Sequence, residues 1–137
     1  MNALSVPVGN QLKGITIDSQ NNLWLASFGN DTVYELDPSG TIIHAVNGVG
    51  GIEAPWGVRV DSDDNVWVAN FTDFLTINHY SISEICGSRP SNCPPGLTTG
   101  DAITPVAGYT LPTGGSQVLL ANGTPLNGPH GPPSYFH

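Results

Sequence analysis

The chain of 137 residues carries eleven acidic and only three basic side chains, which gives a formal net charge of −8 at pH 7. This balance argues against nucleic acid and anionic membranes as partners, because both are bound by clustered Lys and Arg. No apolar run in the sequence approaches the ~20 residues that a membrane-spanning helix needs, so no membrane span is expected. The length suits one ordinary domain.

Two stretches of the sequence repeat one pattern 43 positions apart. Residues 14–28 read GITIDSQNNLWLASF, and residues 57–71 read GVRVDSDDNVWVANF. A spacing of about 40 to 45 residues, with strand-like segments inside each unit, is typical of the blades of a β-propeller. A β-sandwich, which also repeats hairpins, is the alternative. The identical positions are Gly14/Gly57, Asp18/Asp61, Ser19/Ser62, Asn22/Asn65, Trp24/Trp67, Ala26/Ala69 and Phe28/Phe71.

Each copy predicts a strand followed by a tight turn. Residues 14–18 alternate apolar and polar side chains, as a half-buried strand does. The five polar residues that begin at Asp18 predict a reversal in which the Asp18 carboxylate caps backbone amides, and Asp61 has the same role. Asn21 and Asp64 lie where such a turn needs a positive φ, which Asn and Asp tolerate better than other non-glycine residues.

The segment after each turn, residues 23–28 and 66–71, is apolar on both faces. Such a strand is expected to be covered on both sides, as an inner strand between two neighbouring blades would be. Trp24 and Trp67 are therefore predicted to be core residues.

The remaining strands are less regular in the second unit. In the first unit, residues 32–36 and 42–46 are predicted strands, joined by an Asp-Pro-Ser-Gly turn at residues 37–40. In the second unit, residues 75–80 and 81–85 are expected to be the third and fourth strands. The sequence beyond residue 85 is rich in Pro and Gly, with short strands possible at residues 106–109 and 116–121 and an extended or disordered tail at 127–137.

The pattern of both units resembles the NHL-type repeat of six-bladed β-propellers, a family that includes streptogramin lyases, gluconolactonase-like enzymes and secreted bacterial repeat proteins. The residues that carry the resemblance are GITID at 14–18 with NLWLA at 22–26, PWGVRVD at 55–61 with NVWVAN at 65–70, and the YELDPSG hairpin at 34–40. It covers residues 3–85 and is specific for the blade, not for an activity.

The resemblance implies an all-β fold: a partial β-propeller of about two four-stranded antiparallel blades with a Pro/Gly-rich, irregular C-terminal region. The implied division is an outer strand of a preceding blade at residues 1–13, blade one at 14–54, blade two at 55–85, and an insertion or tail at 86–137. Secreted members of the family carry a similar Cys-Gly-x-Arg-Pro-x-x-Cys-Pro-Pro-Gly insertion.

Cys86 and Cys93 lie in one Pro- and Gly-rich loop and are expected to form a disulfide, which implies an oxidising compartment. A metal site is the weaker interpretation, because two thiols without a nearby His fall short of four ligands. The protein is therefore predicted to be extracellular or periplasmic, although Met1–Ser5 lacks the features of a signal peptide.

Two blades leave their outer faces and edges uncovered, since repeats of this kind need about three units to build a continuous core. The chain is thus expected to be a fragment of a longer propeller, which is the favoured interpretation. Alternatively, it is one protomer of an assembly in which other chains supply the missing blades.

No catalytic motif is found, and no catalytic residue is assigned; His44 is expected to be a structural or surface residue. Binding residues generally lie on loops of a rigid scaffold. The contact surface is therefore expected at residues 29–31, 47–56 and 70–74. The candidate ligand-binding residues are Trp56, Asn30, Asp31, Asn70 and Asp73.

These observations favour a non-catalytic propeller module for binding or scaffolding, with a protein or small-molecule ligand and no cofactor. One alternative, implied by the enzyme relatives, is a lyase or lactonase that needs Mg²⁺ or Ca²⁺, held by residues such as Asn70 or Asp73. Another is a structural protein that assembles through its open blade edges. Fold analogy alone does not choose among them.

Overall fold

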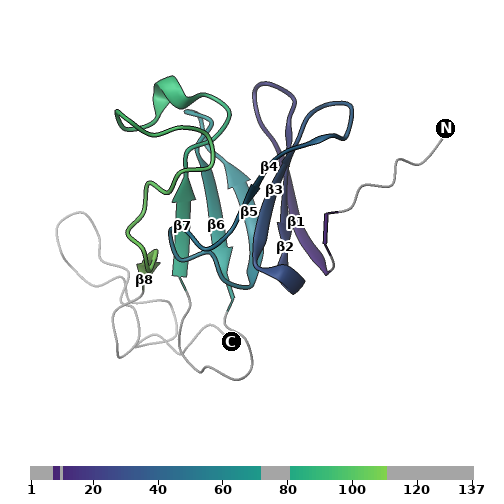
Figure 1. The fold of residues 1–137 in the computed structure, drawn as a ribbon, viewed down its shortest axis with the longest axis vertical. Helices are drawn as coiled ribbons and strands as arrows, with labels where there is room; N and C mark the ends of the chain where they lie inside the picture. Colours follow the sequence, from purple (N-terminus) through teal and green to yellow (C-terminus); the bar gives the residue numbers. More distant parts are fainter. Residues whose placement is uncertain (1–7, 10, 72–80, 111–137) are drawn as a thin grey trace, which may run out of the picture.

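The computed structural model describes residues 8–9, 11–71 and 81–110, and these form two antiparallel β-sheets without an α-helix (Figure 1). The strands of the first sheet follow one another in sequence order, and so do those of the second. The first sheet consists of β1 (Leu12–Ile17), β2 (Leu23–Ser27), β3 (Thr32–Leu36) and β4 (Ile42–Val46). The second consists of β5 (Pro55–Val60), β6 (Val66–Asn70), β7 (Ser81–Ile85) and the two-residue β8 (Tyr109–Thr110).

The two β-turns of the repeat are built as the sequence predicts. The Asp18 carboxylate accepts hydrogen bonds from the backbone N–H of Gln20 (2.8 Å) and Asn22 (2.9 Å). Asp61 does the same for the equivalent amides two and four residues further on. The positive φ expected at Asn21 and Asp64 is confirmed, at 65° and 64°.

Each capping carboxylate also binds the indole of its own unit. Trp24 Nε1 donates to Asp18 Oδ2 at 2.9 Å, and Trp67 Nε1 donates to Asp61 Oδ2 at 2.8 Å. A buried indole N–H needs such a partner. One aspartate therefore joins the turn to the strand that follows it, a link that the sequence did not reveal.

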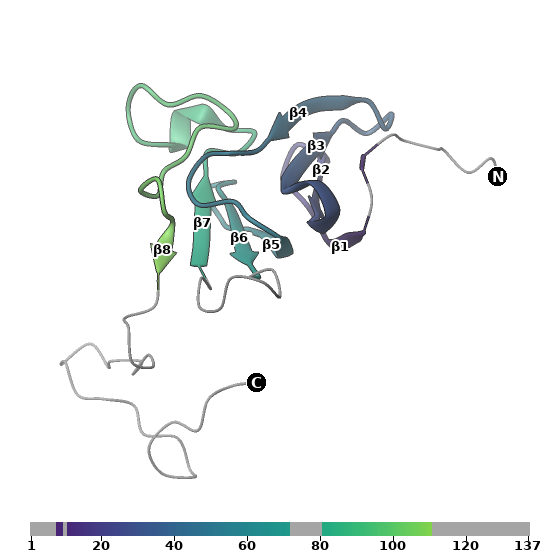
Figure 2. The same cartoon turned by 60° about the horizontal axis from the view of Figure 1, so that its bottom comes forward.

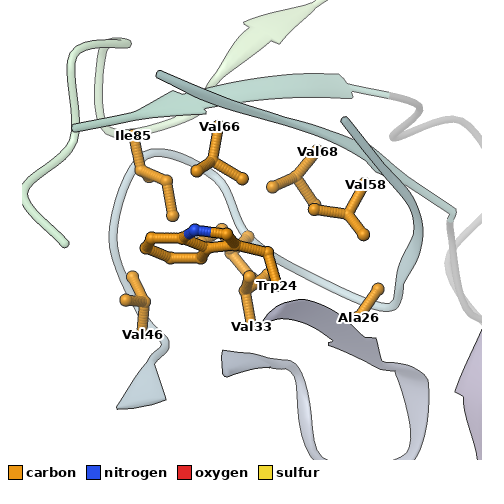
Figure 3. Packing of buried hydrophobic residues seen from close by; sticks show 9 residues of the cluster. Trp24, Ala26, Val33, Val46, Val58, Val66, Val68 and Ile85 are labelled. Carbon is orange, nitrogen blue, oxygen red and sulfur yellow. The ribbon is translucent and has the colours of Figure 1, made fainter. Parts of the chain in front are cut away.

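The main core lies between the two sheets and is centred on Trp24, which is fully buried (Figure 3). In Figure 3 its indole lies between Val46 of the first sheet and Val66 and Ile85 of the second. The other buried members of this cluster are Ala26, Val33, Ile52, Val58 and Val68. Burial of a large aromatic side chain is among the strongest contributions that one residue makes to folding.

The closest approach of the two sheets is at β1 and β5 (Figure 2). A Cβ on Gly14 would lie 2.8 Å from the carbonyl oxygen of Trp56 and 2.9 Å from the backbone nitrogen of Val58. Only a glycine allows the two backbones to come so near.

The far face of the first sheet is covered only in part. Leu25 and Leu36 are buried there against Val8, whereas Ile15 and Ile17 are exposed by 63% and 61%. In the second sheet, Trp67 lies on the face directed away from the first sheet and is half-buried. The prediction of a core residue is therefore correct for Trp24 and wrong for Trp67, because only Trp24 has a second sheet packed against it.

The strand order corrects one expectation. Residues 81–85 form a strand, but β7 pairs with β6 and takes the third position of the second sheet, not the fourth. The fourth position is taken by β8, whose pairing with β7 in the described part of the chain involves Ser81 and Ile82. The strand expected at residues 75–80 lies outside the described residues, as do the possible strand at 116–121 and the tail.

The long connection between β7 and β8 is held to the sheet at its start. The expected disulfide between Cys86 and Cys93 is present. Cys86 also exchanges two backbone hydrogen bonds with this loop, donating to Asp101 O and accepting from Gly100 N, both at 2.8 Å. Arg89 forms an ion pair of 3.1 Å with buried Asp64, which fixes the loop against the β5–β6 turn.

Candidate functional site: an aromatic cluster at one end of the sheets

A cluster of aromatic rings lies where the two sheets meet, around Trp56 at the start of β5. The Trp56 ring lies 5.8 Å from Phe28 in an edge-to-face arrangement and 5.3 Å from Phe71 in a tilted one. Such pairs contribute about 0.5–1.5 kcal/mol each beyond the area they bury. Trp56 nevertheless remains 47% exposed. The cluster thus holds a large apolar ring in place and leaves much of it open to solvent.

Irregular pairing places Trp56 in this position. The register between β5 and β6 shifts between Pro55 and Gly57, so Trp56 is an extra residue in its strand. A bulge of this kind redirects a side chain. The equivalent shift between β1 and β2 falls between Leu12 and Ile15, a stretch that contains Lys13.

Lys13 reaches the same cluster from β1. Its ammonium nitrogen lies 4.4 Å from the centroid of the Trp56 ring and 5.6 Å from that of Phe28. A cation over an aromatic face is attracted by about 0.5–1 kcal/mol at exposed sites. The only lysine of this acidic chain therefore lies beside its most accessible tryptophan.

The carbonyls that precede each sheet fix the two phenylalanines. Phe28 N–H donates to Gln11 O at 3.2 Å, and Phe71 N–H donates to Ala54 O at 3.0 Å. Phe28 and Phe71 are identical positions of the repeat, and Lys13 precedes Gly14 as Trp56 precedes Gly57. The repeat alignment is thus the signal that could have joined these four residues before the structure did.

Asn30 and Asp31 lie in the turn after β2, where Phe28–Asn30 forms the short 3₁₀ turn η1. Asn30 is exposed, and its amide donates to the Tyr34 hydroxyl at 2.7 Å. Asp31 ends the turn with a φ of 53°, and its carboxylate accepts from Ala54 N–H at 2.7 Å. Asp31 therefore binds the connection between the sheets, and both side chains belong to exposed residues.

Asn70 is buried and serves the structure of the second sheet. Its amide donates to the hydroxyls of Ser81 (3.0 Å) and Ser83 (2.8 Å), and its carbonyl accepts from Glu53 N–H at 3.3 Å. Ser83 donates in turn to the carbonyl of Gly50 at 2.6 Å. We therefore leave Asn70 out of the candidate contact surface. Asp73 lies outside the described residues.

A second polar group lies on the edge of the main core, around Glu35 of β3. Its carboxylate is almost fully buried and meets His44 Nδ1 at 2.6 Å and Asn22 Nδ2 at 2.8 Å. Burial raises the pKa of Glu35, and the hydrogen bond to His44 opposes this rise only in part. His44 is half-exposed and borders a shallow hollow beside Val46, Thr99 and Asp101. Glu35 and His44 make a structural pair in which only the carboxylate is buried, and sequence analysis singled out only the histidine.

Within residues 8–9, 11–71 and 81–110, no three His, Cys, Asp or Glu side chains are grouped as metal ligands. The same part of the chain has no helix long and apolar enough to cross a membrane. The sequence matches no protein-family model and no curated protein.

Proposed function

We propose that this chain is a two-blade module of an NHL-type β-propeller that acts by binding, outside the cytoplasm, and uses the aromatic cluster as its contact surface. The exposed ring of Trp56, held between Phe28 and Phe71, is the observation that supports a binding role. A rigid aromatic side chain of this kind provides a large contact area and loses little conformational entropy on binding.

The way the sheets pack supports the propeller. The first sheet contributes the face that carries Trp24 and Ala26, and the second contributes the face that carries Val66 and Val68. In the repeat, Val66 corresponds to Leu23, which points away from Trp24. The interface therefore joins opposite faces of two equivalent sheets, as in an array of repeats, whereas the sheets of a sandwich enclose one common core.

The chemistry of the cluster suggests the class of ligand. An open indole favours an aromatic or aliphatic group, and the Lys13 ammonium beside it favours a carboxylate. A protein segment or small molecule that carries both groups close together fits this surface. The disulfide between Cys86 and Cys93 supports an extracellular or periplasmic location, because such bonds persist in oxidising compartments.

The test uses the three indole N–H resonances of ¹⁵N-labelled protein. The probe is N-acetylphenylalanine, which carries a ring and a carboxylate, and its amide serves as the uncharged control probe. We expect N-acetylphenylalanine to shift the Trp56 resonance saturably and to bind several-fold more tightly than the amide. The Trp24 and Trp67 resonances should stay in place, since both indoles are bonded to aspartates.

Two variants complete this test. Trp56→Ala should abolish binding of both probes, followed at the backbone resonances of Gly57 and Phe71, without loss of folded structure. Lys13→Gln should bind the two probes equally. Absence of a saturable shift at Trp56, or unchanged affinity in Trp56→Ala, would overturn the proposed contact surface.

A further inference from the structure

The outer face of the second sheet repeats the face that the first sheet buries. Trp24, Ala26 and Val33 are fully buried at the interface between the sheets. Their equivalents are Trp67, Ala69 and Ile82, since strand pairing joins Ala26 to Val33 and Ala69 to Ile82. Trp67 is half-buried, Ala69 is exposed, and Ile82 is 44% exposed. We call this surface the Trp67 face.

The outer face of the first sheet repeats the other half of the same interface. Val58 and Val60 of β5 pack into the main core, and their equivalents in β1 are Ile15 and Ile17. These two isoleucines are the exposed part of a surface that we call the Ile15 face. The molecule thus exposes two surfaces, the Trp67 face and the Ile15 face, that match the two sides of the interface between its own sheets.

We propose that a second copy of this chain docks its Ile15 face on the Trp67 face of the first copy and reproduces the packing between β1 and β5. The contact is head-to-tail, because it joins two different surfaces. Such a contact generates a closed ring where the rotation closes and a filament where it does not. The proposed contact follows from the repeat and does not depend on the ligand of the aromatic cluster.

Gly57 is the residue that argues most strongly for this partner. Gly14 must be a glycine because the backbone of β5 lies against it. Gly57 has the same place in the repeat, yet among the described residues a Cβ there would meet only the Ala69 methyl at 3.6 Å, an ordinary contact. Neither glycine has a positive φ. The described part of the chain therefore gives no reason for glycine at 57, whereas the backbone of a docked β1 would supply one.

The polar contact between the sheets also has a free counterpart on each face. Ser19 donates to the Asp64 carboxylate from its backbone N–H at 3.1 Å and from its hydroxyl. The equivalent residues, Ser62 on the second sheet and Asn21 on the first, are both exposed. In the docked pair, Ser62 of one copy would donate to the side-chain oxygen of Asn21 in the other.

Two described residues that precede β1, Val8 and Gln11, are placed much like residues of the connection between the sheets. Val8 is buried in one cluster with Leu25, and Ile52, one position further along in the repeat, is buried in another with Val68. Gln11 and Ala54 both have a positive φ, 54° and 45°, and their carbonyls bind the equivalent amides of Phe28 and Phe71. The Ile15 face thus already has the shape that the second sheet presents to the first.

The charges on the Trp67 face do not oppose docking. Glu84 repeats Glu35, which the internal interface accommodates, and Arg59 replaces Thr16 with a long side chain whose stem can cover apolar surface. Tyr109 stacks on Trp67 with a centroid distance of 6.3 Å and lies at the position of Val46, which the internal interface buries with Trp24.

The experiment measures the mass of the full chain by sedimentation velocity and light scattering over a wide range of concentration. We expect the wild type to form oligomers in a concentration-dependent way. Gly57→Ala should block the Trp67 face. The added Cβ would clash with the backbone of the docked β1, just as a Cβ on Gly14 would clash with β5 inside one chain. Ile15→Asp blocks the opposite face by placing a charge in the apolar contact. Each variant alone should be monomeric, with wild-type circular dichroism and thermal unfolding.

Mixing the two variants identifies the head-to-tail geometry. Gly57→Ala retains an intact Ile15 face, and Ile15→Asp retains an intact Trp67 face, so the mixture should form a heterodimer and nothing larger. Val106→Asp, at an exposed position outside both faces, is the matched control and should assemble like the wild type.

Three results would overturn the proposal. They are a wild type that stays monomeric at every concentration, an oligomer that survives Gly57→Ala, and a homodimer of Ile15→Asp, which would mean that two Trp67 faces pair with each other. Loss of probe binding in Trp56→Ala tests the aromatic cluster separately, so the two proposals can fail independently.

Discussion

The two sheets have almost the same sequence pattern and different surroundings. Trp24 and Trp67 lie at identical positions, follow identical turns and donate to equivalent aspartates at 2.9 and 2.8 Å. Trp24 is fully buried because the second sheet covers it, whereas Trp67 is covered only in part, by Tyr109. The repeat sequence therefore determines the local hydrogen bonds, whereas the burial of each tryptophan depends on whether another sheet packs against it.

The connections between the third and fourth strands differ in a second way. In the first sheet the Asp37 carboxylate accepts from the amides of Ser39 and Thr41, both at 2.9 Å, and Gly40 takes a φ of 86°. These bonds, and above all the Ser39 hydroxyl, lower the pKa of Asp37. In the second sheet a long loop with a disulfide takes the place of this short turn. A turn residue thus organises the connection in the first sheet, whereas a disulfide closes a small ring within the connection of the second.

The largest test of this comparison is the pair Trp24→Ala and Trp67→Ala. Each change removes one indole from an equivalent aspartate, so the lost hydrogen bonds match. Trp24→Ala also opens a cavity in the main core and should lower the free energy of unfolding by about 3–5 kcal/mol. Trp67→Ala should cost roughly 1 kcal/mol, a value near the centre of the range for single substitutions, because Trp67 is only half-buried. Urea unfolding of the monomeric protein measures both; equal losses would show that the neighbouring sheet contributes nothing.

The next test uses the two repeated glycines. Gly14→Ala places a methyl 2.8 Å from the Trp56 carbonyl oxygen and should destabilise the single chain by about 1–3 kcal/mol, because two backbones must move apart. Gly57→Ala should change its stability by less than about 0.5 kcal/mol. Thermal unfolding at a concentration where the protein is monomeric compares the two. A loss in Gly57→Ala as large as that in Gly14→Ala would contradict the structure at β5.

Much of the fold could be predicted because its signals are local. The capping aspartates, the positive φ of Asn21 and Asp64 and the Cys86–Cys93 disulfide each depend on residues a few positions apart. The place of β7 in its sheet could not be predicted, since strand propensity identifies a strand and not its partner. The same limit applies to Trp67. The sequence around it predicts a core residue, and only the structure shows that the first sheet packs against the opposite face of the second sheet.

The candidate site shows the same division. The sequence placed Trp56 on the expected contact surface at residues 47–56, but Lys13, Phe28 and Phe71 join it only through strand pairing and the bulge in β5. Asn70 looked like a loop residue because it ends an apolar strand. In the structure it fills its hydrogen-bonding capacity inside the second sheet, with Ser81, Ser83 and the connection between the sheets.

The smallest effect expected is the pH dependence contributed by Glu35 and its equivalent, Glu84. Burial raises the pKa of both, and the charge of Asp61 adds to the rise at Glu84. A raised pKa in the folded state means that folding favours the protonated acid. The stability that each group contributes is therefore present below its unfolded pKa near 4.5 and is lost as the pH rises through the folded value.

Glu35→Gln should remove this dependence at the more buried site. A glutamine can accept from Asn22 and donate to a neutral His44, so its contacts remain satisfied. We expect the variant to be more stable than the wild type at pH 7 and to lose this advantage toward pH 4. The effect of Glu84→Gln should have the same sign and be smaller, because Glu84 lies on the open face. Thermal unfolding across this pH range checks both. If the stability of Glu35→Gln relative to the wild type were lower at pH 7 than at pH 4, the ionised pair with His44 would outweigh the cost of burial.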